Sequence, residues 1–215
     1  MRYKTCSGTG NDFARVLKMP KDLTQCLDVI LENKQMLIDI GDINGKRFIN
    51  SCGCGIDSQI LMDTQKIKKA VHGPTAYMLS TFKNLASYNA KKIKLTIDGN
   101  EYLRTVILLA IANGNYFGGG MMIAPNAKVD DGLLDVCVIN DLNKIKLITL
   151  FPSIFQGEHI RIKPTVEMFQ GKEIRIENIQ GEMVANADGN LIGATPLFVK
   201  IGDKKMKVIF NDLSD

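Results

Sequence analysis

The stretch from Ala112 to Asp135 constrains the fold more than any other part of this sequence. Seven uninterrupted apolar residues, Val106 to Ala112, lead into it and predict a fully buried β-strand. The three glycines at 118–120 allow close approach of the backbone to a neighbour, or positive φ. After Gly132, the alternating residues 134–138 predict a second strand. We therefore expect two core strands joined by a long, glycine-rich and acidic loop.

The loop has two interpretations. Its Gly, Asn and Asp residues favour turns without any ligand, so it can be a plain hairpin connection. Alternatively, the acidic pair Asp130 and Asp131, together with backbone carbonyls, can hold Mg²⁺ or Ca²⁺, because these cations prefer oxygen ligands. With only one or two carboxylates available, such a site is expected to be weak or structural.

Composition excludes several classes of protein. The chain has 215 residues, of which 45% are hydrophobic and 23% charged, so it can bury a proper core. A net charge of +4 gives mild attraction to phosphate-bearing surfaces but is too small to indicate a nucleic-acid partner. Five cysteines and two histidines fit neither a disulfide framework nor a zinc site. No apolar segment follows Arg2 and Lys4, so we expect no signal peptide and a cytoplasmic protein.

Hydrophobic periodicity predicts many strands and a few helices. Helices are expected at 13–17, 23–33, 75–88 and 144–155, and strands at 36–43, 46–51, 92–98, 105–112, 134–140, 173–178, 182–188, 196–201 and 206–210. The predicted class is α+β, mainly β: an antiparallel β-sandwich-like domain with peripheral helices.

Local signals refine this prediction. Asn44-Gly45 predicts a tight hairpin, and Leu27, Ile30 and Leu31 are expected to form the apolar face of the second helix. The apolar stripe predicted for the helix at 75–88 consists of Ala76, Leu79, Phe82, Leu85 and Ala86.

The segment 52–57 is expected to interrupt the strand pattern, with Cys52 and Cys54 as small buried residues. His72 is interpreted as a capping or turn residue, and His159 as a surface or loop histidine that precedes a strand-like run.

Four motifs in order resemble the bacterial diacylglycerol kinase and sphingosine kinase-like lipid kinases. They are G-T-G-N-D-F-A-R from Gly8, G-x-D ending at Asp57, the block A-N-G-x-Y-x-G-G-G-M-x-I-A-P-x-A-x-x-D-D-G-L-L-D, and D-G-x followed by T-P-L near residue 195. The resemblance extends over nearly the whole chain. It implies that residues 1–35 are a remnant of an N-terminal nucleotide-binding domain and that residues 36–215 form the C-terminal β-rich domain.

The resemblance also implies roles for individual residues in ATP-dependent phosphorylation of a lipid hydroxyl with Mg²⁺. Nucleotide binding is implied for Gly8, Thr9, Gly10 and Asn11, and an acidic catalytic network for Asp12 and Asp57. A structural Mg²⁺ is implied at the Asp131 carboxylate and the backbone carbonyls of Lys128 and Leu133.

The sequence departs from the family pattern in two places. The nucleotide motif G-G-D-G-T, which belongs upstream of residue 1, is absent, and Asn190 stands at the position of the glutamate that acts as general base. An amide cannot take a hydroxyl proton near neutral pH, which leaves Asp188 as a neighbouring substitute.

Two functions therefore stay open: the lipid-binding half of a diacylglycerol-type kinase, or a catalytically inactive module that binds lipid and Mg²⁺. A third, more distant interpretation is an NAD kinase, which shares architecture. The expected partners are a diacylglycerol-like lipid, ATP only together with a nucleotide-binding domain, a transient contact with the inner membrane face, and a second copy of the chain in a homodimer.

Overall fold

The computed structural model describes residues 10–67 and 74–212. The elements run α1 (Asp12–Val16), α2 (Leu23–Glu32), β1 (Gln35–Ile43), β2 (Lys46–Phe48), β3 (Ser51–Gly55), α3 (Ile56–Ile67), α4 (Pro74–Ser87), β4 (Lys91–Ile97), β5 (Asn100–Ala112), β6 (Leu134–Asn140), α5 (Lys144–Ile154), the 3-10 helix η1 (Glu158–Arg161), β7 (Val166–Gly171), β8 (Glu173–Gln180), β9 (Val184–Ala187), β10 (Asn190–Ala194) and β11 (Leu197–Ile209).

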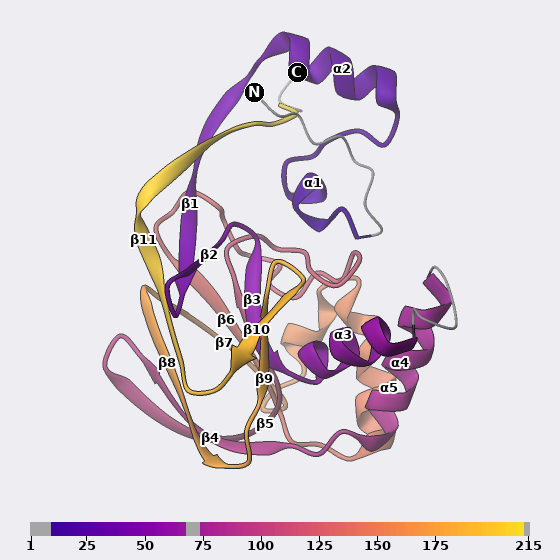
Figure 1. Ribbon diagram of the computed structural model, residues 1–215, viewed down its shortest axis with the longest axis vertical. Coiled ribbons are helices and arrows are strands. Elements are labelled where there is room, and N and C mark those ends of the chain that lie inside the picture. Colours follow the sequence, from indigo (N-terminus) through magenta and orange to yellow (C-terminus); the bar gives the residue numbers. More distant parts are fainter. Residues whose placement is uncertain (1–9, 68–73, 213–215) are drawn as a thin grey trace.

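Eleven antiparallel strands form one strongly curved sheet in the described part of the chain. Its order is β10-β9-β3-β5-β4-β8-β11-β1-β2, while β6 pairs with both β5 and β7. The predicted apolar strand is the second half of β5, which pairs with β3 and β6, whereas the first half of β5 pairs with β4. Figure 1 shows the sheet curled on itself, with a long β1–β11 ribbon rising from it toward α2.

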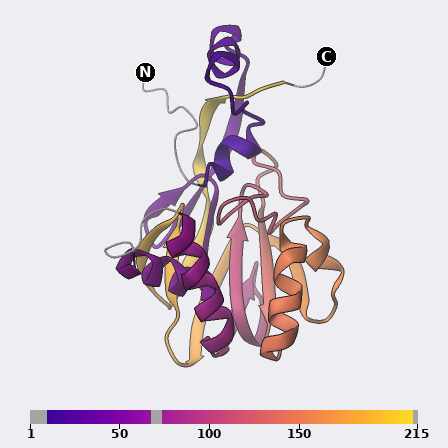
Figure 2. The ribbon, with the colours of Figure 1, turned by 90° about the vertical axis from the view of Figure 1, so that its right-hand side faces the viewer.

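Two apolar cores stabilise this arrangement. One lies inside the curved sheet and includes Ile93, Leu95, Leu109 and Val136. The other lies between the outer face of β5, β6 and β7 and the helices α3, α4 and α5, which Figure 2 shows against that side of the sheet. The predicted class, a mainly β, antiparallel sandwich-like domain with peripheral helices, is confirmed. Among residues 10–67 and 74–212, no helix is both long and apolar enough to cross a membrane.

Several local predictions are confirmed. Asn44 and Gly45 have φ of 50° and 81° and close the β1–β2 hairpin, as a type I′ turn requires. The glycines at 118–120 all have positive φ. Helix α4 is found where it was predicted, and Leu85 of its predicted stripe is buried, whereas Ala86 is exposed. The other stripe side chains, like His72, lie outside the described residues.

The segment 52–57 is the main correction to the predicted strands. Ser51–Gly55 is strand β3 and is fully buried between β5 and β9. It pairs there because Gly53 and Gly55 have no side chains: a Cβ at either position would lie 2.6 or 2.4 Å from a carbonyl oxygen of β5. Cys52 and Cys54 are buried as predicted. Helix α3, which follows directly, was not predicted.

Other boundaries also differ. The two strands predicted at 196–201 and 206–210 are one strand, β11, which carries an irregularity opposite residues 39–41 of β1. Strand β7 was missed. The strand-like run after His159 is not a strand, since its first two residues, Ile160 and Arg161, end the helix η1.

Two side-chain predictions were wrong. His159 is fully buried, not at the surface; its Nε2 lies 3.1 Å from the carbonyl oxygen of Ile123, and burial lowers its pKa. On α2, the buried residues are Cys26 and Val29, while Leu27 and Leu31 of the predicted apolar face are 50% and 81% exposed.

Candidate functional site

The N-terminal motif and the central glycine loop meet at Asp12. Its carboxylate accepts hydrogen bonds from the backbone N–H groups of Gly119, at 2.8 Å, and Gly120, at 2.6 Å. Two segments more than 100 residues apart are joined in this way, because consecutive glycines with positive φ expose their N–H groups to one anion. Gly10 and Asn11 lie in the described part of this loop, whereas Gly8 and Thr9 lie outside it.

Arg15 completes this contact. Its guanidinium donates to Asp12 Oδ1 at 3.0 Å and to the carbonyl oxygen of Gly10. The same group would lie 3.5 Å from a Cβ at Gly120, so it packs over the glycine loop. The Asp12 carboxylate thus occupies the N–H groups of Gly119 and Gly120, and the Arg15 guanidinium beside it is of a type that suits phosphate oxygens. Sequence reasoning did not single out this arginine, although it is part of the N-terminal motif.

Asp188 has its carboxylate fully engaged by the backbone. The N–H groups of Ile49, Asn50 and Ser51 donate to it at 2.9, 3.0 and 3.1 Å. The carboxylate thereby fixes the connection between β2 and β3. Asn190, the residue at the position of the family's glutamate, is exposed, and its amide donates to the Asp188 carbonyl at 3.3 Å.

Asp57 lies in a different environment, in the first turn of α3. Its Oδ2 accepts a hydrogen bond from the Asn186 amide at 2.7 Å, and the Ser58 hydroxyl is 3.5 Å from Oδ1. The side chain is only partly exposed, and burial raises its pKa to about 6. Such a pKa is typical of carboxylates that exchange protons near neutral pH. Asn186 was also missed by sequence reasoning; the available signal was its place two residues before Asp188 in the predicted strand 182–188.

The predicted cation loop is held by Asp39. Gly132 N–H donates to Asp39 Oδ2 at 2.8 Å, and Asp39 N–H donates to the Val129 carbonyl at 2.6 Å. Lys205 bridges the Asp39 carboxylate, at 3.0 Å, and the Asp130 carbonyl, at 3.1 Å. The loop is therefore fixed in place by β1 and β11.

The predicted ligands themselves have the right character for a hard cation. Asp131 is exposed, and its Oδ1 accepts from Leu133 N–H at 3.0 Å. Among the hydrogen bonds of residues 10–67 and 74–212, none uses the carbonyl of Lys128 or Leu133. Burial raises the pKa of the nearby Asp135 carboxyl, and the charge of Asp131 adds to this effect. A carboxylate, two available carbonyls and a neighbouring acid fit Mg²⁺ or Ca²⁺.

The buried side-chain amide of Asn113 connects the turn at Asp188 with the cation loop. The Asn113 side chain donates to the carbonyls of Asp39, at 3.0 Å, and Ile49, at 2.8 Å. Ile49 is in turn held by Asp188, so the Asp188 turn and the cation loop share one hydrogen-bonded support.

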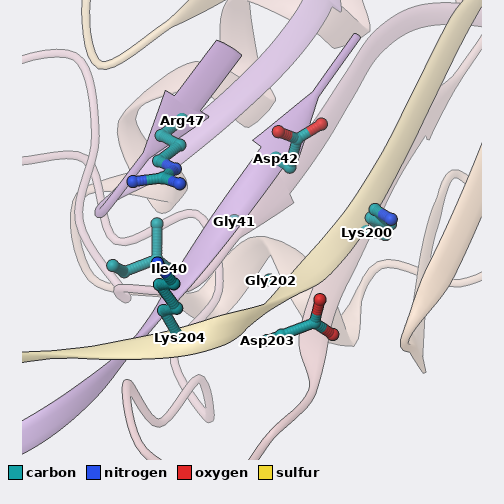
Figure 3. A pocket seen from close by; sticks show the side chains of 8 residues that line it. All are labelled: Ile40, Gly41, Asp42, Arg47, Lys200, Gly202, Asp203 and Lys204. Carbon is teal, nitrogen blue, oxygen red and sulfur yellow. The ribbon is translucent and has the colours of Figure 1, made fainter. Parts of the chain in front are cut away.

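Two hollows lie outside this network. One, of about 380 Å³, is polar and is lined by Gln59 and Asp63 of α3, Lys83 and Asn84 of α4, and Glu182. The other, of about 200 Å³, lies on β1, β2 and β11. Figure 3 shows its charged side chains arranged around Gly41 and Gly202; they are Asp42, Arg47, Lys200, Asp203 and Lys204. Because three cations stand against two carboxylates, this second hollow has little electrostatic preference.

Comparison with known proteins identifies the family. Residues 50–210 match the model of the YegS C-terminal NAD kinase beta sandwich-like domain, and the chain belongs to this family. A diacylglycerol kinase of Staphylococcus aureus strain bovine RF122 / ET3-1 is 31% identical over 189 residues, 88% of this chain and 59% of that protein. The same identity and coverage relate the chain to the diacylglycerol kinase of S. aureus strain Newman. The chain thus spans about three fifths of these relatives.

Solved structures support the same assignment. A protein of Bacillus anthracis str. Sterne, described as a candidate diacylglycerol kinase, superposes with a TM-score of 0.76 at 27% identity, covering 95% of this chain and 67% of the other. A diacylglycerol kinase of the same organism gives a TM-score of 0.67 at 23% identity, over 95% of this chain and 64% of that one, and supports the fold alone. The resemblance inferred from the motifs is therefore confirmed, and with it the membership in a lipid kinase family.

Proposed function

We propose that this chain is the lipid-binding part of an enzyme that transfers the γ-phosphoryl group of ATP to the hydroxyl of a diacylglycerol-like lipid. The observation that carries the proposal is the contact of Asp12 and Arg15 with Gly119 and Gly120. It joins the two motifs through which the family would position phosphates, and it holds the Arg15 cation over the glycine loop. Residues 1–35 would then be the end of a nucleotide-binding domain, and residues 36–215 the β-rich domain.

In this proposal Asp57 accepts the proton of the lipid hydroxyl. The hydroxyl oxygen attacks the γ-phosphorus, the bond from that phosphorus to the oxygen shared with the β-phosphate breaks, and ADP leaves. Asp57 suits this role because its pKa of about 6 keeps it ionised at neutral pH yet basic enough to take a proton. Asp188 is less suitable, since its oxygens already accept three backbone hydrogen bonds.

The cation loop would hold Mg²⁺ through the Asp131 carboxylate and the carbonyls of Lys128 and Leu133. When bound there, the ion would stabilise the loop and lower the repulsion between Asp131 and Asp135. Asp39 and Lys205 orient this loop through Gly132 and Asp130.

A second candidate is an inactive module that binds the lipid without phosphorylating it. The observation that favours it is the exposed Asn190, whose amide donates to Asp188 and cannot act as a base.

Phosphate transfer separates the two candidates. The 215-residue chain and its Asn190→Glu and Asp57→Asn variants are incubated with labelled ATP, Mg²⁺ and dioctanoylglycerol, alone and with an added nucleotide-binding domain from a full-length relative. We expect label in the lipid only with the added domain, and at least about a hundredfold less with Asp57→Asn, the lower end of the range for a general base. Transfer by Asp57→Asn at the wild-type rate would contradict the role of Asp57. No transfer by any combination, with lipid binding intact, would favour the inactive module.

A further inference from the structure

Helices α3 and α4 are joined by buried polar side chains. The Asn84 amide on α4 donates to the Asp63 carboxylate on α3 at 3.2 Å, and the two residues are only 3% and 6% exposed. Lys83 Nζ donates to the same carboxylate oxygen at 2.9 Å. Peripheral helices normally pack through an apolar face, and burying a carboxylate is costly unless it is paired and hydrogen-bonded. This polar contact therefore suggests a role besides packing.

The Asp63 carboxylate fixes the orientation of the amides around it. The hydrogen bond from Lys83 holds the pKa of Asp63 below its usual range, so the group is ionised and only accepts hydrogen bonds. Gln59 Nε2 donates to it at 3.2 Å, as the Asn84 amide does. Both amides thus turn their N–H₂ groups toward Asp63. Among residues 10–67 and 74–212, no donor reaches Gln59 Oε1 or Asn84 Oδ1, so these two acceptors are available to a ligand.

Both amides line the polar hollow of about 380 Å³ described above, which we call the α3–α4 hollow. In Figure 1, α3 runs from β9 toward α4, and residues of all three elements line the hollow. Pockets that hold small molecules have volumes of about 300–1,000 Å³. The α3–α4 hollow is at the small end of this range, so it suits a single ring and not an extended ligand.

The charges of the α3–α4 hollow balance. It is lined by two cations and two carboxylates, which are Lys83, Lys91, Asp63 and Glu182. Without a net charge, it favours neither an anion nor a cation. The opposite charges also lie close together: Lys83 is paired with Asp63. The Lys91 ammonium nitrogen would lie 3.1 Å from a Cβ at Gly181, the residue before Glu182. A zwitterion with separated charges is therefore not favoured either, and the hollow suits an uncharged ligand.

Hydroxyl groups match the hydrogen-bonding groups that remain. A hydroxyl donates one hydrogen bond and accepts others. Hydroxyls on one ring would donate to Gln59 Oε1 and Asn84 Oδ1, and another would accept from the Lys91 ammonium group. An apolar ligand would leave all three groups without partners, which is unfavourable inside a hollow.

The α3–α4 hollow is a neighbour of the proposed reaction site and not a part of it. Gly55 and Gln59, which line the hollow, are each two residues from Asp57, whereas Asp57 itself does not line it. Tyr88 is another lining residue. Burial raises its pKa, and negative charge on Cys54 and Asp57 adds to this effect, so the hollow lies within electrostatic reach of Asp57.

We propose that the α3–α4 hollow binds an uncharged polyhydroxy group, such as a sugar ring. The ring can come from a free sugar or from the headgroup of a glycolipid, since both present the same hydroxyls. This inference goes beyond the proposed function and does not depend on it, because the binding needs neither ATP nor phosphate transfer.

The test is an NMR titration of the ¹⁵N-labelled 215-residue chain with methyl glucoside. We expect the side-chain amide signals of Gln59 and Asn84 to shift saturably, with a Kd on the order of 1 mM, as is usual for a ligand of this size. Glucose 6-phosphate should bind no more tightly, because the carboxylates of Asp63 and Glu182 offset the attraction of the two lysines for the phosphate.

Two variants and their matched controls locate the ligand, with the Asn84 amide as the reporter. Lys91→Met should raise the Kd about tenfold or more, and Gln59→Met about fivefold, as expected for losing a charged and a neutral hydrogen bond. The controls are Lys92→Met, whose side chain lies on the other face of β4, and Gln65→Met, at an exposed position of α3 outside the hollow. Both controls should bind methyl glucoside like the wild type.

Equal urea midpoints for the four variants would show that the fold is retained. Absence of a saturable shift in the wild type would mean that the hollow holds water only and would overturn the proposal. Equal losses from Lys91→Met and Lys92→Met would also overturn it, as would glucose 6-phosphate binding about tenfold more tightly than methyl glucoside, which would indicate an anion site.

A second titration, with glucosyl-dioctanoylglycerol, distinguishes the two sources of the sugar. If the hollow receives a glycolipid headgroup, this lipid should bind at least about tenfold more tightly than methyl glucoside, because its acyl chains add apolar burial. Equal Kd values would identify a free sugar, and either result supports the site. Phosphate transfer to dioctanoylglycerol, which carries no sugar, tests the proposed function separately.

Discussion

Asp57 follows β3 and Asp188 follows β9, and each carboxylate bonds a residue of the other strand, yet the surroundings of the two carboxylates have opposite effects. Asp188 accepts three hydrogen bonds from consecutive backbone N–H groups and stabilises the turn between β2 and β3. Asp57 has one short hydrogen bond, from Asn186, and burial raises its pKa to about 6. The first carboxylate contributes to stability, whereas the second is destabilising when ionised. An acid that costs stability is the better candidate for chemistry.

The largest expected effect on stability is that of Asp188→Ala. The change leaves the N–H groups of Ile49, Asn50 and Ser51 without their acceptor. Because Asp188 is exposed and water can reach part of this turn, we expect a loss of about 1–3 kcal/mol in the free energy of unfolding. Urea denaturation followed by circular dichroism measures it. Asp188→Asn is the matched control, because asparagine keeps one acceptor oxygen and tolerates the positive φ of 45° at this position. It should lose about half as much. A loss below about 1 kcal/mol for Asp188→Ala would remove the contrast with Asp57.

Asp57→Asn should change the free energy of unfolding in the opposite direction. The ionised carboxylate is disfavoured by its surroundings, so we expect the variant to be more stable than the wild type by about 1–2 kcal/mol at pH 8, after allowance for the partial exposure of the side chain. The same urea titration measures it. Destabilisation at pH 8 would show that Asp57, like Asp188, is held for structure.

The gain from Asp57→Asn should also depend on pH. Because the pKa of Asp57 is about 6 in the folded chain and about 4 when unfolded, the folded state binds the proton more tightly. The free-energy penalty for ionising Asp57 in the folded chain is therefore absent below about pH 4, grows between about pH 4 and 6, and is constant above that range. Buried His159, whose pKa is lowered, has the opposite trend and loses stability on acidification. The contribution of His159 is the same in both proteins, so it cancels when the two free energies of unfolding are subtracted. A difference that stays constant from pH 4 to 8 would contradict the raised pKa of Asp57.

Asn186→Ala should have the smallest effect and sharpens the comparison further. Removal of the amide takes away a hydrogen bond to the ionised form of Asp57, so the pKa of Asp57 should rise above its wild-type value. NMR titration of the ¹³C-labelled carboxyl measures it. Ser87→Ala is the control, since the Ser87 hydroxyl donates to the Lys83 carbonyl within α4. An unchanged pKa of Asp57 in Asn186→Ala would show that this contact does not stabilise the carboxylate.

The sequence predicted those parts of the fold that depend on local patterns. Alternation and turn chemistry located β1, β2, β5 and β6, the Asn44-Gly45 hairpin and the glycine-rich loop. The same patterns missed β3, because Cys-Gly-Cys-Gly has low strand propensity. The segment is a strand only because β5 and β9 approach its glycines closely. Tertiary contact decided that pairing.

The site was predicted as a set of positions but not as an arrangement. The motifs named Asp12, Asp57, Asp188 and Asn190 by resemblance. That Asp188 is engaged by the backbone depends on the register of β9 against β3, which places Ala187 opposite Cys52. No local pattern encodes such a register between strands more than 130 residues apart.

The central claim is that Asp57 receives the lipid hydroxyl. Isothermal titration calorimetry tests it most directly, by measuring the binding of dioctanoylglycerol, without ATP, to the 215-residue chain and to Asp57→Asn. If Asp57 receives the lipid hydroxyl, the wild type binds the lipid saturably and Asp57→Asn raises the Kd about tenfold, the loss expected for one hydrogen bond to a charged acceptor. An equal Kd for the two proteins, or no saturable binding by the wild type, would contradict the claim.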